Sequence, residues 1–206
     1  MERTQLRIVA GSLRGRRLTV TVHPGLRPTP QMVREALFSI LGNAVPERPF
    51  VDVFAGTGVV GLEALSRGAS RATFVERDFR LLADLERHLA AFGVADRATL
   101  ARGDVYRWAE RWRPPAEPVN AFLSPPFADL QDRAEDFLAL VRRLQDALAY
   151  GSVLVLQVEV GFDLTALPDA QRWEHRHYGR NILLFWEPAD GKNDECTTNA
   201  PPMTKE

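Results

Sequence analysis

One segment constrains the fold of this chain more than any other: Val51-Asp-Val-Phe-Ala-Gly-Thr-Gly-Val-Val-Gly61. Its apolar start predicts a buried strand, and its glycines predict a tight turn that opens a helix. Because glycine has no Cβ, such a turn lets backbone N–H groups come close to a bound ligand. The segment therefore predicts an α/β fold with a ligand site where this strand ends.

Strand and helix patterns alternate from this segment onward. Apolar strand patterns lie near residues 50–54, 72–75, 98–101, 119–123 and 152–158. Helical patterns lie between them, near residues 58–67, 78–92, 106–112 and 130–148. Two last strand patterns, near 171–177 and 181–186, predict an antiparallel hairpin. We therefore expect a Rossmann-like, mostly parallel seven-stranded sheet with helices on both faces and ligands at the carboxyl ends of its strands.

The first 45 residues follow a different pattern. Residues 7–11 and 17–22 alternate apolar and polar side chains and predict a small hairpin with a basic turn. A proline-rich connector over 24–30 leads to a helix, for which Thr29 is the expected N-cap. We expect a basic N-terminal hairpin and helix over 1–45, a main α/β domain over 46–188 and a polar, disordered tail over 189–206.

Composition excludes several classes of protein. The 206 residues suffice for one α/β domain with a small appendage, and no apolar run reaches the roughly 20 residues that span a bilayer. The N-terminus lacks the apolar region of a signal peptide, so we expect a cytoplasmic protein. The single cysteine, Cys196, excludes an internal disulfide, and the four histidines show no metal-site spacing beyond His175-x-His177. We expect no metal.

Positive charge is concentrated near the N-terminus although the net charge is only −1. Residues 1–34 contain seven arginines and one acid. Such a local excess indicates contact with a polyanion, here RNA. The alternative is a solvated arginine face without a partner. The candidate RNA-binding residues are Arg7, Arg14, Arg16, Arg17 and Arg34.

The glycine turn fits two kinds of cofactor. Gly56-Thr-Gly-Val-Val-Gly61 matches the dinucleotide pattern, and Glu76 follows Gly56 by 20 residues. S-adenosylmethionine is favoured because the strand begins only at residue 50, after a separate basic element. In addition, the acid Asp52 would repel a pyrophosphate but can hold the amino-acid end of S-adenosylmethionine. The expected cofactor contacts from this strand and turn are Asp52, Phe54, Ala55, Gly56, Thr57 and Gly58.

Acids at the ends of the next two strands complete the predicted cofactor site. Glu76, with Arg77 beside it, is expected to accept hydrogen bonds from the ribose hydroxyls. Asp104 is expected to bind the adenine amino group, with Val105 packing on the ring. The alternatives are a solvated acid for Glu76 and a helix N-cap for Asp104.

A second motif, Ser124-Pro-Pro-Phe127, follows the apolar strand 119–123. In Asp/Asn-Pro-Pro-Tyr/Phe motifs, the side-chain oxygen and a proline-fixed carbonyl accept hydrogen bonds from a nucleobase amine, and the aromatic ring stacks on the base. We therefore predict that Ser124, Pro125, Pro126 and Phe127 are catalytic and that Ser124 also contacts the cofactor. Serine is shorter and uncharged, so we expect turnover to suffer more than binding. A water molecule or the nearby Asp129 is a candidate to replace the carboxylate or amide that is missing at position 124.

Together these residues resemble the RsmD-type bacterial 16S ribosomal RNA guanine-N2 methyltransferases. The resemblance runs from Arg7 to about Glu187 and rests on ordered motifs: Arg7-Ile-Val-Ala-Gly11, Arg14-Gly-Arg-Arg-Leu18, Leu26-Arg-Pro-Thr29, Val33-Arg-Glu-Ala-Leu-Phe38, Asp52-Val-Phe-Ala-Gly-Thr-Gly58 and Gly61-Leu-Glu-Ala-Leu-Ser-Arg67. It implies a class I S-adenosylmethionine-dependent fold and methyl transfer to the N2 amine of one guanine of 16S rRNA within the assembling small ribosomal subunit. It also implies that Arg27 and Thr29 line the cofactor pocket. Nothing in the sequence demands more than a monomer.

Three other functions stay open at this stage. One is a DNA adenine or protein-glutamine methyltransferase that uses a similar motif, although the chain has no separate target-recognition domain. Another is a catalytically weakened or silent RNA-binding or ribosome-assembly factor of the same fold, for which Ser124 is the best support. The last is a dinucleotide-dependent oxidoreductase.

Overall fold

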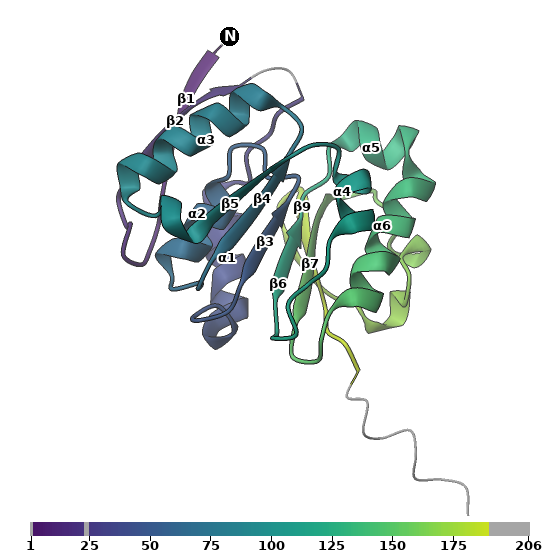
Figure 1. Cartoon of the computed structure of the whole chain (residues 1–206). Coiled ribbons are helices and arrows are strands. Elements are labelled where there is room, and N and C mark those ends of the chain that lie inside the picture. Colours follow the sequence, from purple (N-terminus) through teal and green to yellow (C-terminus); the bar gives the residue numbers. More distant parts are fainter. Residues whose placement is uncertain (1, 23–24, 190–206) are drawn as a thin grey trace, which may run out of the picture.

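A seven-stranded mixed sheet forms the centre of the protein in the computed structural model, which describes residues 2–22 and 25–189 (Figure 1). In spatial order its strands are β5 (Ala98–Arg102), β4 (Ala72–Glu76), β3 (Phe50–Val53), β6 (Asn120–Leu123), β7 (Val153–Glu159), β9 (Asn181–Trp186) and β8 (Glu174–Tyr178). The first five are parallel to one another, whereas β9 runs antiparallel to both β7 and β8. The predicted fold class is confirmed.

Six α-helices connect and flank these strands in the described part of the chain. They are α1 (Gln31–Leu41), α2 (Val59–Ser66), α3 (Phe79–Phe92), α4 (Val105–Arg111), α5 (Phe127–Asp132) and α6 (Ala134–Ala147). Short 3-10 turns lie at Gly42–Ala44, Ala95–Arg97, Leu164–Ala166 and Ala170–Arg172. Over residues 2–22 and 25–189, no helix has both the length and the apolar character needed to cross a membrane.

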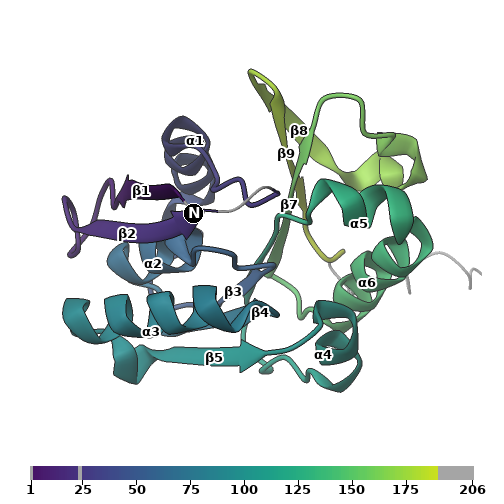
Figure 2. The ribbon, with the colours of Figure 1, turned by 90° about the horizontal axis from the view of Figure 1, so that it is seen from above.

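The sheet separates two apolar layers, and Figure 2 shows helices on both of its faces. On the face of α1, α2 and α3, the strands contribute Phe50, Phe74 and Phe122. On the face of α4 and α6, they contribute the alternate residues Val51 and Leu123. This alternation follows from the two-residue period of a strand, which sends successive side chains to opposite faces.

The N-terminal hairpin differs from its predicted position. Strand β1 (Glu2–Arg7) pairs with β2 (Arg17–Val22), so the prediction of a first strand over residues 7–11 is wrong. The reason is that the backbone N–H groups of Val9 and Ala10 donate to the carboxylate of Glu63 on α2, at 2.9 and 3.0 Å. Residues 8–16 therefore form a loop that is attached to α2.

Ser66 holds the same loop one helical turn further along α2. Its hydroxyl accepts from the Leu13 N–H at 2.9 Å and donates to the Ala10 carbonyl, while its own carbonyl accepts from the Ser12 N–H at 2.7 Å. The loop and α2 approach so closely that a Cβ on Gly11 would lie 1.8 Å from the Ser66 carbonyl oxygen. The glycine at position 11 is therefore required by this contact.

Two predicted helix boundaries also differ. The long helix expected over 130–148 is broken at Arg133, which leaves the helical conformation between α5 and α6. Helix α1 begins one residue later than expected, with Pro30 at the cap position. The Thr29 hydroxyl, the predicted cap, instead donates to the Gln157 side chain of β7 at 2.9 Å.

Substitution of Gly11 tests how strongly the hairpin loop depends on α2. Gly11→Ala should lower the free energy of unfolding by about 2–4 kcal/mol, since the added methyl group displaces the Ser66 carbonyl. Gly15→Ala is the matched control, because Gly15 has a similar positive φ (85° against 81°) but no atom within 4 Å of its Cβ position. Urea unfolding measures both variants. Equal losses of stability would mean that backbone strain, not the contact with α2, explains the glycine.

Candidate functional site

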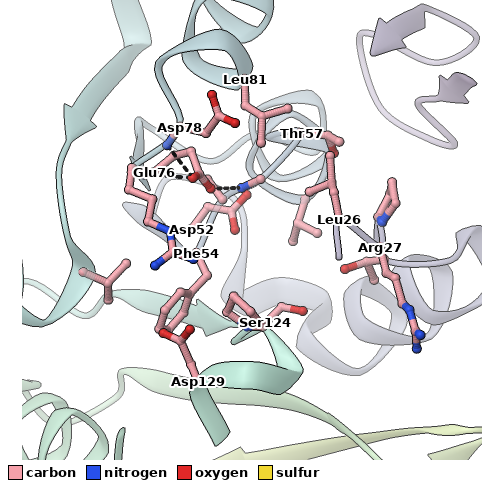
Figure 3. A pocket seen from close by; sticks show the side chains of 18 of the residues that line it. Leu26, Arg27, Asp52, Phe54, Thr57, Glu76, Asp78, Leu81, Ser124 and Asp129 are labelled. Atoms are coloured by element: carbon pink, nitrogen blue, oxygen red, sulfur yellow. Dashed lines mark hydrogen bonds between the residues drawn. The ribbon is translucent and has the colours of Figure 1, made fainter. Parts of the chain in front are cut away.

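A cavity of about 420 Å³ opens at the carboxyl ends of β3, β4, β5 and β6 (Figure 3). The turns after these strands form most of its wall, and residues 25–29 of the N-terminal connector close one side. Its size suits a cofactor or other small molecule. In a parallel sheet the carboxyl ends of neighbouring strands meet at one edge, which explains how segments far apart in the sequence come together.

Nearly all of the predicted cofactor residues line this cavity. They are Arg27, Thr29, Asp52, Phe54, Ala55, Gly56, Thr57, Glu76, Arg77, Asp104, Val105 and Ser124. Gly58 does not line it. Gly58 is the residue before α2, with φ 70°, and a Cβ there would lie 2.5 Å from the side chain of Leu85. Its role in the structure is to let α2 start close to α3.

The glycine turn is held in an unusual backbone conformation. Phe54 has φ 65° and Gly56 has φ 53°, both in the left-handed region. For a bulky residue such as Phe54 this conformation costs free energy, so the surroundings must impose it. In the first turn of α2, Gly61 packs where a Cβ would lie 2.3 Å from the Phe74 ring. The glycine turn thus places the first residues of α2 in the wall of the cavity.

Glu76 fastens this turn to the end of β4. Its Oε2 accepts from the Gly56 N–H at 2.8 Å, and its Oε1 accepts from the N–H groups of Arg77 and Asp78, each at 2.8 Å (dashed lines in Figure 3). A carboxylate has about four acceptor positions, so capacity for a ligand hydroxyl group is left. Glu76 therefore has a structural role in addition to its place in the cavity wall.

Asp52 lies under the turn and is buried. Its Oδ2 accepts from the Gly61 N–H at 2.9 Å, which ties β3 to the first turn of α2. Burial raises the pKa of Asp52 to about 8, and the nearby charge of Glu76 adds to this, against the lowering effect of the Gly61 hydrogen bond. The carboxyl group of Asp52 therefore carries a proton for much of its population at neutral pH.

Asp104 caps α4 and also forms an ion pair. Its Oδ1 accepts from the N–H groups of Tyr106 and Arg107 at 3.1 Å, so the expected N-cap is present. Its Oδ2 accepts from Arg133 at 2.9 Å. Burial works against ionisation, but the hydrogen bonds from Arg107 and Arg133 outweigh it and hold the pKa of Asp104 below its ordinary value. Asp104 is thus a carboxylate in the cavity wall.

The predicted catalytic motif is divided between two cavities. Ser124 and Pro126 line the first cavity, together with Asp129 from α5. The Phe127 side chain is 62% exposed and lines a neighbouring apolar cavity of about 380 Å³ with Phe162 and Val160. Pro125 lines neither of these cavities. The structure therefore brings the hydroxyl group to the cofactor cavity and leaves the aromatic ring facing outward beside it.

Some residues of the cavity wall were not among the predicted site residues. They include Leu26, Leu81 and Tyr106, of which Leu26 is the first residue of the Leu26-Arg-Pro-Thr29 motif. Tyr106 packs edge-on against Phe54, with ring centroids 5.9 Å apart. Its hydroxyl donates to Asp129 at 2.9 Å. The position of Tyr106 directly after the predicted Asp104-Val105 pair was the one available hint for this residue.

The predicted RNA-binding arginines fall into two groups. Those on the hairpin and its loop are exposed: Arg7, Arg14, Arg16 and Arg17. Arg34 on α1 is only 1% exposed, and its guanidinium donates to the carbonyls of Thr29 at 2.6 Å and Arg7 at 2.8 Å. Arg34 thus links the hairpin to the connector, and its burial argues against contact with RNA. In the described part of the chain, no group of three or more His, Cys, Asp or Glu side chains is arranged to hold a metal ion.

Comparison with solved structures identifies the class of fold. A hypothetical protein of Thermus thermophilus superposes with a TM-score of 0.70 at 32% identity, covering 88% of this chain and 99% of that one. An RNA methyltransferase from Salinibacter ruber, solved in complex with S-adenosyl-L-homocysteine, superposes with a TM-score of 0.56 at 21% identity, covering 82% of this chain and 98% of that one. The fold, with its edge cavity and closing hairpin, is that of the class I methyltransferases.

The family follows from the sequence comparisons. The family model described as Conserved hypothetical protein 95 matches residues 6–187, and the chain belongs to this family. The Ribosomal RNA small subunit methyltransferase D of Escherichia coli (strain K12) is 40% identical over 124 residues. That match covers 60% of this chain and 61% of the relative, which is less than two thirds of the relative's length. The predicted resemblance to RsmD-type proteins is confirmed.

The raised pKa of Asp52 predicts a specific pH dependence of stability. The folded-state pKa, about 8, exceeds the ordinary value of 3.8, so the folded state holds the Asp52 proton more tightly than the unfolded chain does. The stability that this difference contributes is complete below about pH 4 and is lost as the pH rises through about 8. Asp52→Asn cannot titrate, so the wild type should lose stability relative to this variant between about pH 4 and about pH 8. Urea unfolding of both proteins at several pH values measures the difference, and a difference that does not change with pH would contradict the assignment.

Proposed function

We propose that this protein transfers a methyl group from S-adenosyl-L-methionine to the exocyclic N2 amine of a guanine in small-subunit (16S) ribosomal RNA. The observation that carries the proposal is the position of Ser124 and Pro126 in the wall of the same cavity as Glu76 and Asp104. A motif that accepts hydrogen bonds from a nucleobase amine therefore lies beside a cavity typical of nucleoside cofactors. The name of the Escherichia coli relative supports the same substrate class.

The cavity fits S-adenosyl-L-methionine at each end. Glu76 retains acceptor capacity for ribose hydroxyls, and the ionised Asp104 beside Val105 suits an adenine with its amino group. Two further acids, Asp52 and Asp78, also line the cavity and suit a ligand that carries positive charge, which itself favours the ionised form of Asp52. When bound, this cofactor supplies an electrophilic methyl group on a sulfonium. The Salinibacter ruber protein of the same fold was solved with the demethylated form of this cofactor.

The remaining chemistry belongs to the motif after β6. A guanine N2 amine is a weak nucleophile because its lone pair is delocalised into the ring. Accepting its N–H bonds directs the lone pair, and rigid alignment with the methyl group lowers the barrier further. We assign this task to the Ser124 hydroxyl and the carbonyl groups fixed by Pro125 and Pro126. The exposed Phe127 ring is available to stack on a base that has left the RNA helix.

A groove connects the arginine hairpin with this cavity. It has a volume of about 530 Å³, and β1 residues including Arg7 line one side of it. Its other side consists of Leu26, Arg27, Pro28 and Thr29, which also line the cofactor cavity. We propose that RNA phosphates bind the exposed hairpin arginines and that residues 1–45 act both as the RNA contact and as a lid of the cofactor pocket. Residues 46–188 then form the methyltransferase domain.

The setting of the reaction follows from the substrate. We propose that the protein acts in the cytoplasm, as a monomer, on 16S rRNA in the assembling small ribosomal subunit. The small-subunit name of the relative supports the RNA, and the exposed hairpin arginines support a polyanionic partner. The predicted polar tail lies, from residue 190 onward, outside the part of the chain that the structure describes.

Ser124 favours one alternative function. If a neutral hydroxyl group is too weak an acceptor, the same fold acts as a silent RNA-binding or ribosome-assembly factor. The two functions share the cofactor cavity and the arginine hairpin, so binding alone does not separate them. Only a measurement of methyl transfer separates the two functions.

Methyl transfer is the direct test of the proposed function. Purified wild-type protein should incorporate labelled methyl groups from S-adenosyl-L-methionine into guanine N2 of small ribosomal subunits that lack this modification. Ser124→Asp, run beside it, should be at least as active, since a charged acceptor is about twice as strong as a neutral one. Incorporation by the variant alone would instead identify the wild type as a silent factor.

Cofactor affinity tests the cavity independently of the reaction. Glu76→Gln should weaken binding of S-adenosyl-L-homocysteine by about 10-fold, because the amide retains one acceptor oxygen but loses the charge. Glu86→Gln, an exposed position on α3, is the matched control. Isothermal titration calorimetry measures both. If Glu76→Gln bound S-adenosyl-L-homocysteine as tightly as the wild type, Glu76 would not be the residue that binds the ribose.

RNA affinity tests the hairpin. The double variant Arg14→Ala/Arg16→Ala should weaken binding to the small subunit and reduce the slope of log K against log salt by about 1–2. The control is Arg142→Ala/Arg143→Ala on α6, which also removes two arginines but lies on the other side of the molecule from the hairpin (Figures 1 and 2). Equal effects in the two double variants would show that binding follows total charge and not the hairpin.

A further inference from the structure

The wall of the cavity near Ser124 contains a second candidate acceptor, Asp129. Asp129 lies in the first turn of α5 and is only 6% exposed, yet it lines the cofactor cavity. Figure 3 shows Ser124 and Asp129 toward the same end of the cavity, away from Leu81. The chain thus has a carboxylate close to the position where its motif lacks one.

The two oxygens of Asp129 have different surroundings. Oδ2 accepts from the Tyr106 hydroxyl at 2.9 Å. Oδ1 accepts no hydrogen bond from residues 2–22 and 25–189. It is not fully enclosed by the protein, so a ligand group can reach it. A carboxylate oxygen that is accessible and has no protein partner is available to accept a hydrogen bond from a ligand group in the cavity that Asp129 lines.

Tyr106 is itself fixed from two sides, which holds Asp129 in place. The Arg133 guanidinium lies 3.8 Å from the centre of the Tyr106 ring and binds Asp104 and Asp136, each at 2.9 Å. The Phe54 ring packs edge-on against Tyr106. Because the tyrosine hydroxyl donates to Oδ2, it restricts the orientation of the Asp129 carboxylate.

The other acids of the cavity wall have different tasks. Asp52 binds the Gly61 N–H, and Glu76 binds three backbone N–H groups of the glycine turn and of the segment that leads to α3. Asp104 is engaged by the α4 N-terminus and by Arg133. Asp78 is the N-cap of α3 and accepts from the Arg80 N–H at 2.8 Å. These four acids lie in or after β3, β4 and β5, whereas Asp129 belongs to the segment that begins at Ser124. Asp129 is therefore the acid on the side of the methyl acceptor.

We propose that Asp129 is a catalytic residue that substitutes for the carboxylate or amide missing at position 124, with Oδ1 accepting an N–H of the guanine N2 amine. This inference rests on the proposed function. In the reaction, the N2 lone pair forms the new N–CH₃ bond while the S–CH₃ bond breaks and its electron pair remains on sulfur as a neutral thioether. The positive charge passes to N2, which releases one proton to Oδ1 of Asp129 and from there to solvent. Tyr106 is a positioning residue that acts through Oδ2.

The first experiment measures recognition of the amine without any reaction. The protein is saturated with S-adenosyl-L-homocysteine, and guanosine monophosphate is compared with inosine monophosphate, which lacks only the 2-amino group. The wild type should prefer the guanosine nucleotide by about 10-fold or more, the value of one hydrogen bond to a charged group. Asp129→Ala should lose most of this preference and keep only the part that the neutral acceptors at Ser124 and the following prolines provide. Tyr106→Phe, which keeps the carboxylate, should retain most of the preference.

The second experiment measures single-turnover methyl transfer to small ribosomal subunits. Asp129→Ala should be slower by about 100-fold, with unchanged affinity for S-adenosyl-L-homocysteine. Ser124→Asp, introduced into the Asp129→Ala protein, should restore most of the rate. This rescue distinguishes a lost acceptor from a misfolded cavity, because a damaged cavity would not recover.

The outcomes separate this inference from the function on which it rests. If Asp129→Ala keeps both the nucleotide preference and the rate, Asp129 is not the acceptor. If Asp129→Ala and Tyr106→Phe lose both properties equally, Asp129 only supports Tyr106 and the inference is wrong. If the wild type neither binds S-adenosyl-L-homocysteine nor transfers a methyl group, the proposed function itself fails.

Discussion

The fully buried carboxylate of Glu63 is the interaction on which the two parts of the structure depend. It accepts two backbone N–H groups of the hairpin loop and forms an ion pair with Arg67 at 3.0 Å. Removal of one partner from such a buried set costs about 3–5 kcal/mol, because the remaining charge has no water to replace it. Glu63 lies on α2, and α2 begins at the glycine turn of the cofactor cavity. The same helix therefore sets the position of the cavity floor and of the arginine hairpin, so that both parts share one rigid support.

Much of the fold could be predicted from the sequence because its patterns are local. Strands such as Asn120–Leu123 are mostly apolar and lie between prolines, and helix α3 carries an apolar stripe and a capping Asp78. The errors occurred where a distant residue decides the local conformation. A strand was predicted over residues 7–11, but Glu63 and Ser66, more than 50 positions away, bind the backbone of residues 9 and 10 instead. Likewise, nothing in the pattern over 130–148 shows that Arg133 leaves the helix to reach Asp104.

The candidate site was predictable to the extent that its residues stand in ordered motifs at strand ends. Glu76 and Asp104 follow directly from strand positions, since parallel strands deliver their carboxyl ends to one edge. Arg34 shows the limit of such reasoning. Its charge suggested a surface contact, yet its guanidinium binds two backbone carbonyls in the interior. Composition cannot distinguish an arginine that binds phosphate from one that binds carbonyl groups, because both ligands accept hydrogen bonds from the same fork of N–H donors.

The break in the helix at Arg133 and the serine at position 124 acquire a common explanation in the structure. At the break, the Arg133 guanidinium binds Asp104 and Asp136 and lies over the Tyr106 ring. The Tyr106 hydroxyl in turn donates to Asp129 at the cavity wall. A carboxylate five residues after Ser124, presented from α5, reaches the cavity from a different backbone position than an aspartate within the motif would. With Asp129 as the acceptor, the serine at 124 and the acid at 129 share one task, so the effect of a change at either position depends on the other.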